Sequence, residues 1–430
     1  MTQARLEAWL EQLLERDPDR IEPGVERVRR VAGDLLDGPP EATVIAVAGT
    51  NGKGSSVAML SAICRAAGYR VGSYTSPHLV DVRERFAIDG SEIAPERLVE
   101  VFERIESHPD SGSLTYFEWL TVAALLVFAA EGASVWVLEV GLGGRLDAVN
   151  ALDADLALIT AIGLDHQDWL GDSREVIGGE KAGILRSGQP AVYVDPDPVE
   201  AVLRAGDAIG ARLRSFGAEL SLLPPAGDSF EMIAPEGGRR HALPPLRGEH
   251  QRRNAAGVVA LLTHPDCALS VSDEAIDAGL RAVTVVGRME GVEREGRTIL
   301  LDVAHNGEAA RALSESLGSL SGGRRLAVFS ALSDKPVAQV VAPLIDRVDA
   351  WWVAGLPGSR AMPGDELRQL LDAAGGSEVH RESDLLAAYN AAFDASRPGD
   401  EIVIFGSFHV VGPLRHRLHP ADNEVSGDTP

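Results

Sequence analysis

The sequence predicts an α/β fold in two domains, and three observations support this. Short apolar runs alternate with longer stretches of helical periodicity, which is typical of a mainly parallel sheet covered by helices. The 430 residues exceed one domain of ordinary size. A second strand and helix series begins after Arg288, so we expect a larger domain over residues 1–286 and a smaller one over residues 287–430.

The larger domain is expected to contain buried parallel strands, because its apolar runs are nearly continuous. These strands are predicted at residues 43–48, 70–74, 134–140, 156–162 and 191–194. Helical patterns cover residues 55–67, 117–130 and 251–263. Residues 208–248 are rich in Pro and Gly and predict small antiparallel strands.

The smaller domain repeats the alternation of strands and helices. Strands are predicted near residues 298–303, 325–330, 350–354 and 401–405. Helices are predicted near residues 307–320, 336–346, 365–374 and 383–396. This alternation again predicts a parallel α/β sheet.

Composition excludes several classes of protein. The 40 Lys and Arg residues against 64 Asp and Glu residues give a net charge of −24, which argues against a nucleic-acid partner. Cys64 and Cys267 are too few for a disulfide framework, and the apolar stretch at residues 122–130 is too short to cross a membrane. The N-terminal residues carry acids and no apolar core, so we expect no signal peptide and a cytoplasmic protein.

A glycine-rich loop between a predicted strand and a predicted helix is the strongest chemical signal. Glycines let backbone amides surround an anion, the helix N-terminus faces it, and a lysine neutralises phosphate charge. The loop departs from G-x-x-x-x-G-K-[ST], because Gly54 separates Lys53 from Ser55. The alternative is a plain turn with a solvent-exposed lysine. The loop consists of Gly49, Thr50, Asn51, Gly52, Lys53, Gly54 and Ser55.

Polar residues follow other predicted strands, at the edge where open α/β sheets bind ligands. Glu139 is a candidate Mg²⁺ partner beside the phosphate loop, although an acid at a strand end is often only solvated. His166 follows the next strand, and a lone histidine is more often structural than a ligand. Lys181 by itself indicates only a surface lysine. In the smaller domain, the corresponding polar residues are Asp302, His305, Ser407 and His409.

Seven segments occur in order along almost the whole chain: GTNGKGS at 49–55, SPHL at 76–79, LEVGLGGRLDAVN at 138–150, LDHQDWLG at 164–171, EKAGI at 180–184, DVAHN at 302–306 and GSFH at 406–409. This set resembles the dihydrofolate synthase/folylpolyglutamate synthase family of Mur-ligase-like, ATP-dependent amide ligases. The resemblance implies an N-terminal P-loop ATPase domain and a smaller C-terminal Rossmann-like domain. The first and third segments separate this branch from the cell-wall ligases.

The resemblance also implies roles for residues that bind ATP and metal. Lys53 and the loop amides would hold the phosphates, while Ser55 and Glu139 would bind one Mg²⁺. A second Mg²⁺ would use Glu139, His166 and Lys181, with the lysine N-carboxylated so that it becomes an oxygen donor. Asn254, Arg288 and Asp302 would lie at the nucleotide. A monovalent cation such as K⁺ is a further expected ligand.

The implied substrates are 7,8-dihydropteroate or reduced folates and L-glutamate, and we expect a monomer. Glutamate is assigned to His305, Ser407 and His409. The segment at residues 21–28 also resembles one that closes on dihydropteroate in bifunctional members, which favours both activities. The pterin or folate is assigned to Ser76, Pro77, His78, Thr115, Phe117, Asp147 and Ala148.

The chain departs from the family pattern at three places, none of which lies in the phosphate loop. Val286 replaces the proline of Pro-Gly-Arg, Gly307 replaces a proline after DVAHN, and Pro336 replaces the second acid of Asp-Lys-Asp. Two alternatives stay open. One is a folylpolyglutamate synthase without the first activity, and the other is a nucleotide-binding regulator without ligase chemistry.

Overall fold

The computed structural model describes residues 2–15, 24–36, 38–225, 227–320, 322–358 and 360–419. The described chain divides into two compact units. The first comprises the residues up to His78, Val82–Pro245 and Gln251–Thr284, and the second comprises Leu79–Asp81, Leu246–His250 and the residues from Val285 onward.

The first unit is built on a sheet with the strand order β4-β3-β2-β5-β1-β6-β7-β8. The neighbouring strands β2, β5, β1, β6, β7 and β8 pair in parallel. Beyond β2, the strands β3 and β4 extend the sheet in antiparallel pairing. The strands are β1 (Thr43–Ala48), β2 (Val71–Tyr74), β3 (Phe86–Ile88), β4 (Ser91–Glu92), β5 (Val135–Glu139), β6 (Leu156–Ile159), β7 (Pro190–Tyr193) and β8 (Arg212–Ser215).

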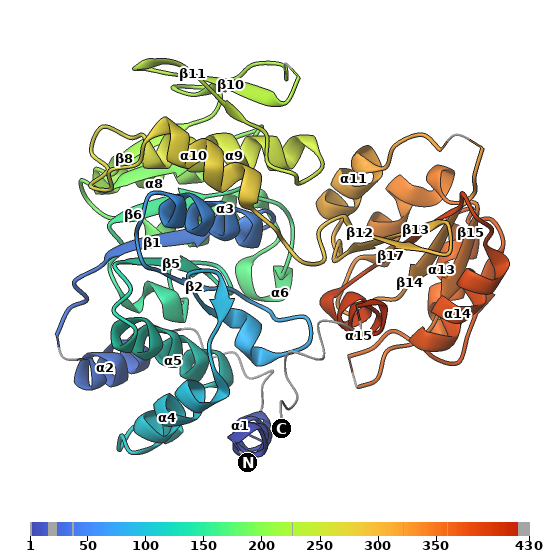
Figure 1. Ribbon diagram of the computed structural model, residues 1–430, viewed down its shortest axis with the longest axis horizontal. Helices are drawn as coiled ribbons and strands as arrows, with labels where there is room; N and C mark the ends of the chain where they lie inside the picture. Colours follow the sequence, from blue (N-terminus) through green and yellow to red (C-terminus); the bar gives the residue numbers. More distant parts are fainter. Residues whose placement is uncertain are drawn as a thin grey trace. The chain divides into compact units, whose positions relative to one another are not determined.

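Helices cover both faces of this sheet, with α3, α9 and α10 on one face and α2, α4 and α5 on the other (Figure 1). The helices are α1 (Thr2–Leu14), α2 (Glu26–Leu35), α3 (Lys53–Ala66), α4 (Pro95–Glu106), α5 (Tyr116–Ala130), α6 (Gln167–Leu170), α7 (Arg174–Lys181), α8 (Glu200–Ile209), α9 (Glu249–Leu262) and α10 (Asp273–Ala282).

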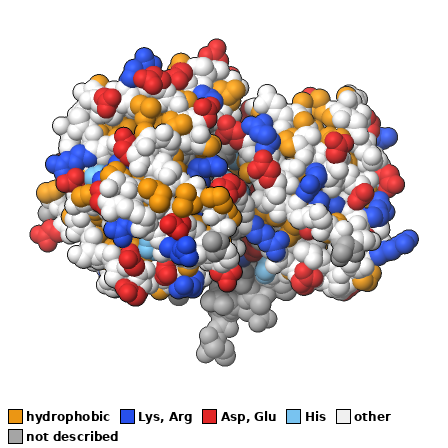
Figure 2. Space-filling model, turned by 90° about the horizontal axis from the view of Figure 1, so that it is seen from above, with side chains coloured by type: hydrophobic (Ala, Val, Ile, Leu, Met, Phe, Trp, Pro, Cys, Tyr) orange, Lys and Arg blue, Asp and Glu red, His pale blue; other side chains and the backbone are white. Residues whose placement is uncertain are grey.

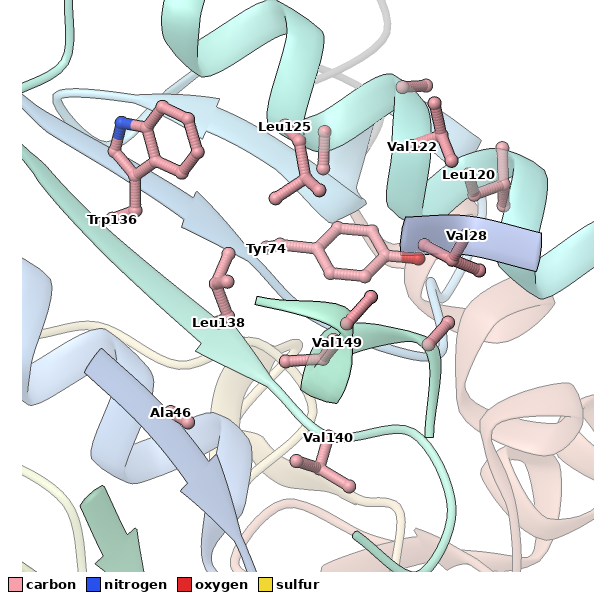
Figure 3. Packing of buried hydrophobic residues seen from close by; sticks show 14 of the residues in the cluster. Val28, Ala46, Tyr74, Leu120, Val122, Leu125, Trp136, Leu138, Val140 and Val149 are labelled. Atoms are coloured by element: carbon pink, nitrogen blue, oxygen red, sulfur yellow. The ribbon is translucent and has the colours of Figure 1, made fainter. Parts of the chain in front are cut away.

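The core under α5 explains why this helix is apolar on almost every side. Tyr74 points its ring among Leu125, Leu138 and Val149 (Figure 3). Its hydroxyl accepts a hydrogen bond from Thr121 Oγ1 at 3.4 Å, so the one polar atom of the ring has a partner in the core. Burial of apolar side chains on both sheet faces is the main stabilising contribution to such a domain.

Residues 208–248 are only partly as predicted. The strands β9 (Ser221–Leu222), β10 (Ser229–Ala234) and β11 (Gly237–Ala242) do form a small antiparallel sheet. Arg212–Ser215, however, pairs in parallel with β7 and extends the main sheet as β8. Its short alternating pattern resembles an isolated hairpin strand, and only the long-range partner decides which sheet it joins.

The second unit has a sheet with the order β12-β13-β17-β14-β15-β16, parallel except for the edge strand β12. The strands are β12 (Glu290–Arg294), β13 (Arg297–Asp302), β14 (Arg325–Phe329), β15 (Ala350–Val353), β16 (Val379–Arg381) and β17 (Glu401–Phe405). The helices are α11 (Gly307–Ser316), α12 (Val337–Val341), α13 (Gly364–Ala373), α14 (Leu385–Ala395) and α15 (Phe408–Leu418).

Alternate residues of these strands enter two separate cores, as the period of two along a strand requires. Leu300, Phe329 and Phe405 pack in the core that includes residues of α11, α12 and α13. Ile299 and Ile404 pack in the core that includes residues of α14 and α15. The predicted α/β class with two helix-covered sheets is therefore confirmed.

The acid surplus is not gathered in one patch on the face that Figure 2 shows. Acidic and basic side chains are interspersed there. Within the described residues, no helix has the length and apolar character needed to cross a membrane.

Candidate active site

The phosphate loop lies at the centre of the first sheet, where the strand order places β1 between β5 and β6. Gly52 is the N-cap of α3 with φ +93°, and a side chain there would also meet Asn254 Nδ2 at 2.7 Å. A Cβ atom at Gly49 would lie 1.7 Å from Thr160 Oγ1. The helix begins at Lys53 rather than at the predicted residue 55, so Lys53 and Ser55 both lie in its first turn.

Two lysines meet at one backbone carbonyl of this loop. Lys53 Nζ donates to Gly49 O at 3.1 Å and to Thr50 O at 3.2 Å. Lys181 Nζ, at the end of α7, donates to the same Gly49 O at 2.9 Å. Lys181 is 4% exposed and lies against the phosphate loop, although the residue by itself indicated only a surface lysine.

The composition carries a signal for Lys181 that does not depend on the family resemblance. Of the 40 Lys and Arg residues, only three are lysines: Lys53, Lys181 and Lys335. A chain that uses arginine almost everywhere keeps lysine where a primary amine is needed, because arginine stays protonated and cannot supply a neutral amine. Two of the three lysines meet at the phosphate loop.

The pKa of Lys181 is lowered from 10.5 to about 7. Burial is the main cause, since it penalises the charged form, and the neighbouring Lys53 adds repulsion. The carboxylates of Asp165 and Asp147 oppose this shift. A large fraction of Lys181 is therefore a neutral amine near pH 7.

This shift predicts a pH dependence of stability. Between about pH 7 and 10.5, unfolded Lys181 binds a proton that the folded form has lost, so the free energy of unfolding rises with pH. The variant Lys181→Met lacks this titrating group, so its free energy of unfolding exceeds that of the wild type most below pH 7. Urea unfolding of both proteins in CO₂-free buffers across this range measures the difference. A difference that does not change with pH would contradict the assigned pKa.

Glu139 lies against the phosphate loop, and Ser55 is the last residue of that loop. Glu139 ends β5, is 4% exposed, and accepts the Ser76 N–H at 3.2 Å through Oε2. A Cβ atom at Gly54 would lie 3.6 Å from that oxygen, so the carboxylate lies against the loop. Ser55 Oγ accepts a hydrogen bond from Gln251 Nε2 at 3.1 Å. Gln251 is a buried residue of α9 that the sequence had not singled out.

The loop after β6 is joined to the phosphate loop through its backbone. Thr50 N donates to Ala161 O at 2.8 Å, and Gly163 N donates to Thr50 Oγ1 at 2.9 Å. His166 lies in this loop with left-handed backbone (φ +50°) and an exposed side chain. The structure therefore brings the His166 loop to the phosphate loop, while a metal role of the ring stays a prediction.

The residues predicted for the pterin lie around the start of α5 and the loop after β5. Thr115 caps α5, with its Oγ1 accepting Glu118 N at 3.3 Å. Phe117 is half-buried, and its ring lies so close to Gly141 that a Cβ there would be 2.4 Å away. Asp147, which precedes Ala148, is buried, and burial raises its pKa to about 6.

Asp147 already orders its own loop. Its carboxylate accepts backbone N–H groups from Leu142 at 2.8 Å and Val149 at 2.9 Å. The role expected from the resemblance, accepting hydrogen bonds from a pterin, stays a prediction. In the SPHL segment, His78 Nδ1 accepts from Arg85 Nε at 2.9 Å, and the Ser76–Pro77 peptide is cis.

The N-terminal segment predicted to approach this region is described only from Gly24 onward, so Ile21–Pro23 lie outside the described residues. Gly24 N donates to Leu146 O at 3.1 Å. Arg27 forms a two-point ion pair with the buried Glu118, with Nη2 to Oε1 at 2.7 Å. The described part of the segment therefore contacts both elements that carry the predicted pterin residues.

In the second unit, the candidate residues meet because β13 and β17 are neighbours, with Asp302 opposite Phe405. The Arg288 guanidinium lies 5.7 Å from the centre of the Phe408 ring, and the His305 ring centre lies 6.3 Å from it. Asp302 accepts N–H groups from Met289 at 3.0 Å and Ala304 at 2.9 Å. Burial raises the pKa of Asp302, and Arg288 opposes this shift.

A buried serine hydroxyl lies at the N-terminus of α15. Ser407 is its N-cap and is 6% exposed, but its side chain does not cap the helix. Within the described residues, Ser407 Oγ has no hydrogen-bond partner. A helix N-terminus attracts anions, and a buried unpaired hydroxyl there is available to a ligand. His409 lies exposed in the first turn.

The residues at the phosphate loop fit a divalent ion that is shared with a nucleotide. No group of three or more His, Cys, Asp or Glu side chains in the described parts of the chain could hold a metal alone. Mg²⁺ is commonly bound by one or two carboxylates together with substrate phosphates. The buried Glu139 carboxylate and the Ser55 hydroxyl beside the loop suit that arrangement.

Comparison with known proteins identifies the family. Residues 47–262 match the Mur ligase middle domain, and residues 287–408 match the Mur ligase, glutamate ligase domain. The chain is 39% identical over 424 residues to the Escherichia coli dihydrofolate synthase/folylpolyglutamate synthase, covering 98% of this chain and 97% of the relative.

Solved structures agree with the sequence comparisons. E. coli FolC in complex with DHPP and ADP has a TM-score of 0.88 at 37% identity, covering 97% of this chain and 98% of that chain. A bifunctional folylpolyglutamate synthase/dihydrofolate synthase with Mn, AMPPNP and L-glutamate bound has a TM-score of 0.86 at 39% identity, covering 96% and 98%. The phosphate loop at the centre of the first sheet and the match along both units confirm the resemblance: the chain belongs to the dihydrofolate synthase/folylpolyglutamate synthase family of Mur ligases.

Proposed function

We propose that this chain is an ATP-dependent ligase that joins L-glutamate to 7,8-dihydropteroate and then adds γ-linked glutamates to reduced folates. The observation that carries the proposal is the phosphate loop flanked by Glu139 and Lys181 in a chain that matches bifunctional enzymes over nearly its full length. The Gly24–Arg27 contacts with the predicted pterin region support the dihydropteroate activity.

The chemistry follows from the poor reactivity of a carboxylate. Transfer of the γ-phosphoryl group of ATP to the substrate carboxylate forms an acyl phosphate and releases ADP. The glutamate amine, after losing a proton, attacks the acyl carbon, and phosphate leaves as the amide forms. Lys53 and the amides of the phosphate loop bind and orient the transferred group, which is the main protein contribution to phosphoryl transfer.

Ser55 and Glu139 are proposed to hold one Mg²⁺, and Glu139, His166 and Lys181 are proposed to hold a second ion. When bound, Mg²⁺ neutralises the negative charge that phosphoryl transfer concentrates between the phosphates. We assign Lys181 as the carbamate, because only a neutral amine adds CO₂ and its pKa is lowered to about 7. Formation of the bond between Lys181 Nζ and the carbon of CO₂ releases one proton and gives a carbamate, whose anionic oxygens can bind a metal ion.

The second unit is proposed to bind glutamate through His305, Ser407 and His409, with Arg288, Asp302 and, in the first unit, Asn254 assigned to the nucleotide. The α15 N-terminus and the Ser407 hydroxyl, which has no partner in the described part of the chain, suit a carboxylate. The pterin is assigned to Thr115, Phe117, Asp147, Ala148 and the SPH segment. The cytoplasmic location, the monomeric state and a K⁺ ion remain predictions.

The deciding experiment measures glutamate-dependent release of ADP in two arms, one with 7,8-dihydropteroate and one with a tetrahydrofolate monoglutamate. We expect release in both arms. Release in the second arm alone would identify a folylpolyglutamate synthase without the first activity. No release in either arm would contradict the proposal and favour a nucleotide-binding regulator.

Ser407→Ala separates binding from folding. Because the hydroxyl has no partner among the described residues, its removal is expected to leave thermal stability unchanged, whereas the glutamate KM rises about tenfold through loss of one hydrogen bond. The control is Ser314→Ala, whose hydroxyl donates to Pro343 O at 2.6 Å. That variant should lose about 1 kcal/mol of stability and keep the glutamate KM. An unchanged glutamate KM in Ser407→Ala would remove Ser407 from the pocket.

A further inference from the structure

Asp195 is a buried acid that no part of the proposed chemistry uses. It follows β7 and is 2% exposed. Its Oδ2 accepts the Ile162 N–H at 2.7 Å and the Tyr193 hydroxyl at 3.2 Å. Its Oδ1 accepts Asp197 N–H at 3.0 Å, and Arg174 Nη2 lies 3.1 and 3.2 Å from the two oxygens.

Arg174, in the first turn of α7, holds the other side of the same peptide segment. Its Nε donates to Ile162 O at 2.8 Å. Ile162 therefore has its N–H bound by Asp195 and its carbonyl bound by Arg174, and these two side chains are bound to each other. Arg174 Nη2 and Nη1 also reach the carbonyl and the carboxylate of Asp197, at 2.7 and 2.6 Å.

This arrangement accounts for the backbone of the loop after β6. The Ala161 carbonyl accepts Thr50 N–H at 2.8 Å, and the Gly163 N–H and carbonyl pair with Thr50 Oγ1 at 2.9 and 3.1 Å. Ile162, between these two residues, is held by Asp195 and Arg174. Buried backbone groups need such partners, and here those on either side of Ile162 come from the phosphate loop.

We propose that Asp195 and Arg174 are positioning residues that clamp Ile162 and thereby hold the loop carrying Asp165 and His166 against Thr50 of the phosphate loop. The inference rests on the nucleotide-binding role in the proposed function. The clamp acts on the nucleotide and its metal, because the contacts described above lead from Ile162 to Thr50 of the phosphate loop and to the 163–166 loop. It leaves glutamate binding, in the second unit, unaffected.

The test uses binding of ADP with and without Mg²⁺, measured by calorimetry, together with the KM values for ATP and glutamate. Asp195→Ala is expected to weaken MgADP binding and raise the ATP KM about tenfold. The reason is that Ile162 N–H loses its acceptor and Arg174, which binds Ile162 O, loses its buried partner. Asp195→Asn keeps an acceptor for Ile162 N–H and should recover most of this loss. The glutamate KM should stay unchanged in both.

Asp197→Ala is the matched control. Its side chain is 84% exposed and binds the same arginine, but it makes no contact with Ile162 in the clamp. The MgADP affinity and the ATP KM of Asp197→Ala should stay within about twofold of the wild-type values, because an exposed ion pair contributes little. If Asp195→Ala does not fold, Arg174→Met is measured in its place, because it removes the hydrogen bond to Ile162 O. The same weakening of MgADP binding and the same rise in the ATP KM are expected.

Two results would overturn the clamp. In the first, Asp195→Ala has a lowered thermal stability but the same MgADP affinity as Asp197→Ala, which is the behaviour of a merely structural residue. The other is an equal rise of all KM values. Failure of the proposed ligase activity is distinguishable, because wild-type protein would then bind MgADP without releasing ADP from ATP in either substrate arm.

Discussion

ATP turnover by Lys181→Ala is expected to fall by about two to three orders of magnitude and to return in part when propionate is added. The reason is that the proposed active form of Lys181 is a carbamate, and a short carboxylate can replace its oxygen atoms in the cavity left by the side chain. The lysine is buried and donates to Gly49 O, so the space left by its side chain would adjoin the phosphate loop. The measurement is glutamate-dependent ADP release as a function of propionate concentration.

The controls separate the carbamate from a plain ammonium group. Propylamine added to Lys181→Ala should not restore turnover, and Lys181→Arg, which keeps a positive charge, should remain as inactive as the alanine variant. Rescue by propylamine together with activity in Lys181→Arg would show that the positive charge acts. Full activity of Lys181→Ala would remove this residue from the site altogether.

Glu139→Gln is expected to lower ATP turnover by about two orders of magnitude and to raise the Mg²⁺ concentration needed for half-maximal activity. Glutamine has the size of glutamate and can still accept the Ser76 N–H, so the loop keeps its shape and only the negative charge is lost. Metal titrations of both proteins measure the effect. The unfolding curves of Glu139→Gln and the wild type should be similar.

The matched control for Glu139 is Glu180→Gln. Glu180 precedes Lys181, but its carboxylate pairs with Arg145 at the surface, at 2.9 Å. Loss of this exposed pair should change turnover by less than about twofold. If both glutamine variants show the same loss, the effect reports local charge in general rather than a metal ligand, and the role of Glu139 is refuted.

Much of the fold could be predicted from the sequence because the strands are buried on both faces. Residues 44–48 and 402–405 are uninterrupted apolar runs, and the structure has strands at the predicted bounds Thr43–Ala48 and Glu401–Phe405. Arg212–Ser215 was missed as a strand of the main sheet, since its polar, short sequence has no preference that identifies β7 as its partner. The edge strands β4, β12 and β16 were also missed because their sequences are mostly polar, and β3 was missed because it has only three residues.

The candidate site shows the same division. The residues of the phosphate loop, 49–55, form a local motif between a strand and a helix, so they could be named from the sequence pattern. Gln251, Asp195 and Arg174 could not, because a buried glutamine or an Asp–Arg pair has no local signature and gains its role only from what it contacts. Arg27 and Glu118, separated by 91 residues, are a further example.

The sequence by itself determined the alternation of strands and helices, the phosphate loop and the family resemblance, because these depend on local periodicity and on short motifs. The tertiary structure alone decided the strand order that places β1 between β5 and β6, and with it the approach of Lys181 to Gly49. Burial at that point lowers the pKa of this lysine to about 7. Burial and partners are properties of long-range packing, so a lysine that looks like a surface residue in the sequence becomes part of the site only when the chain is folded.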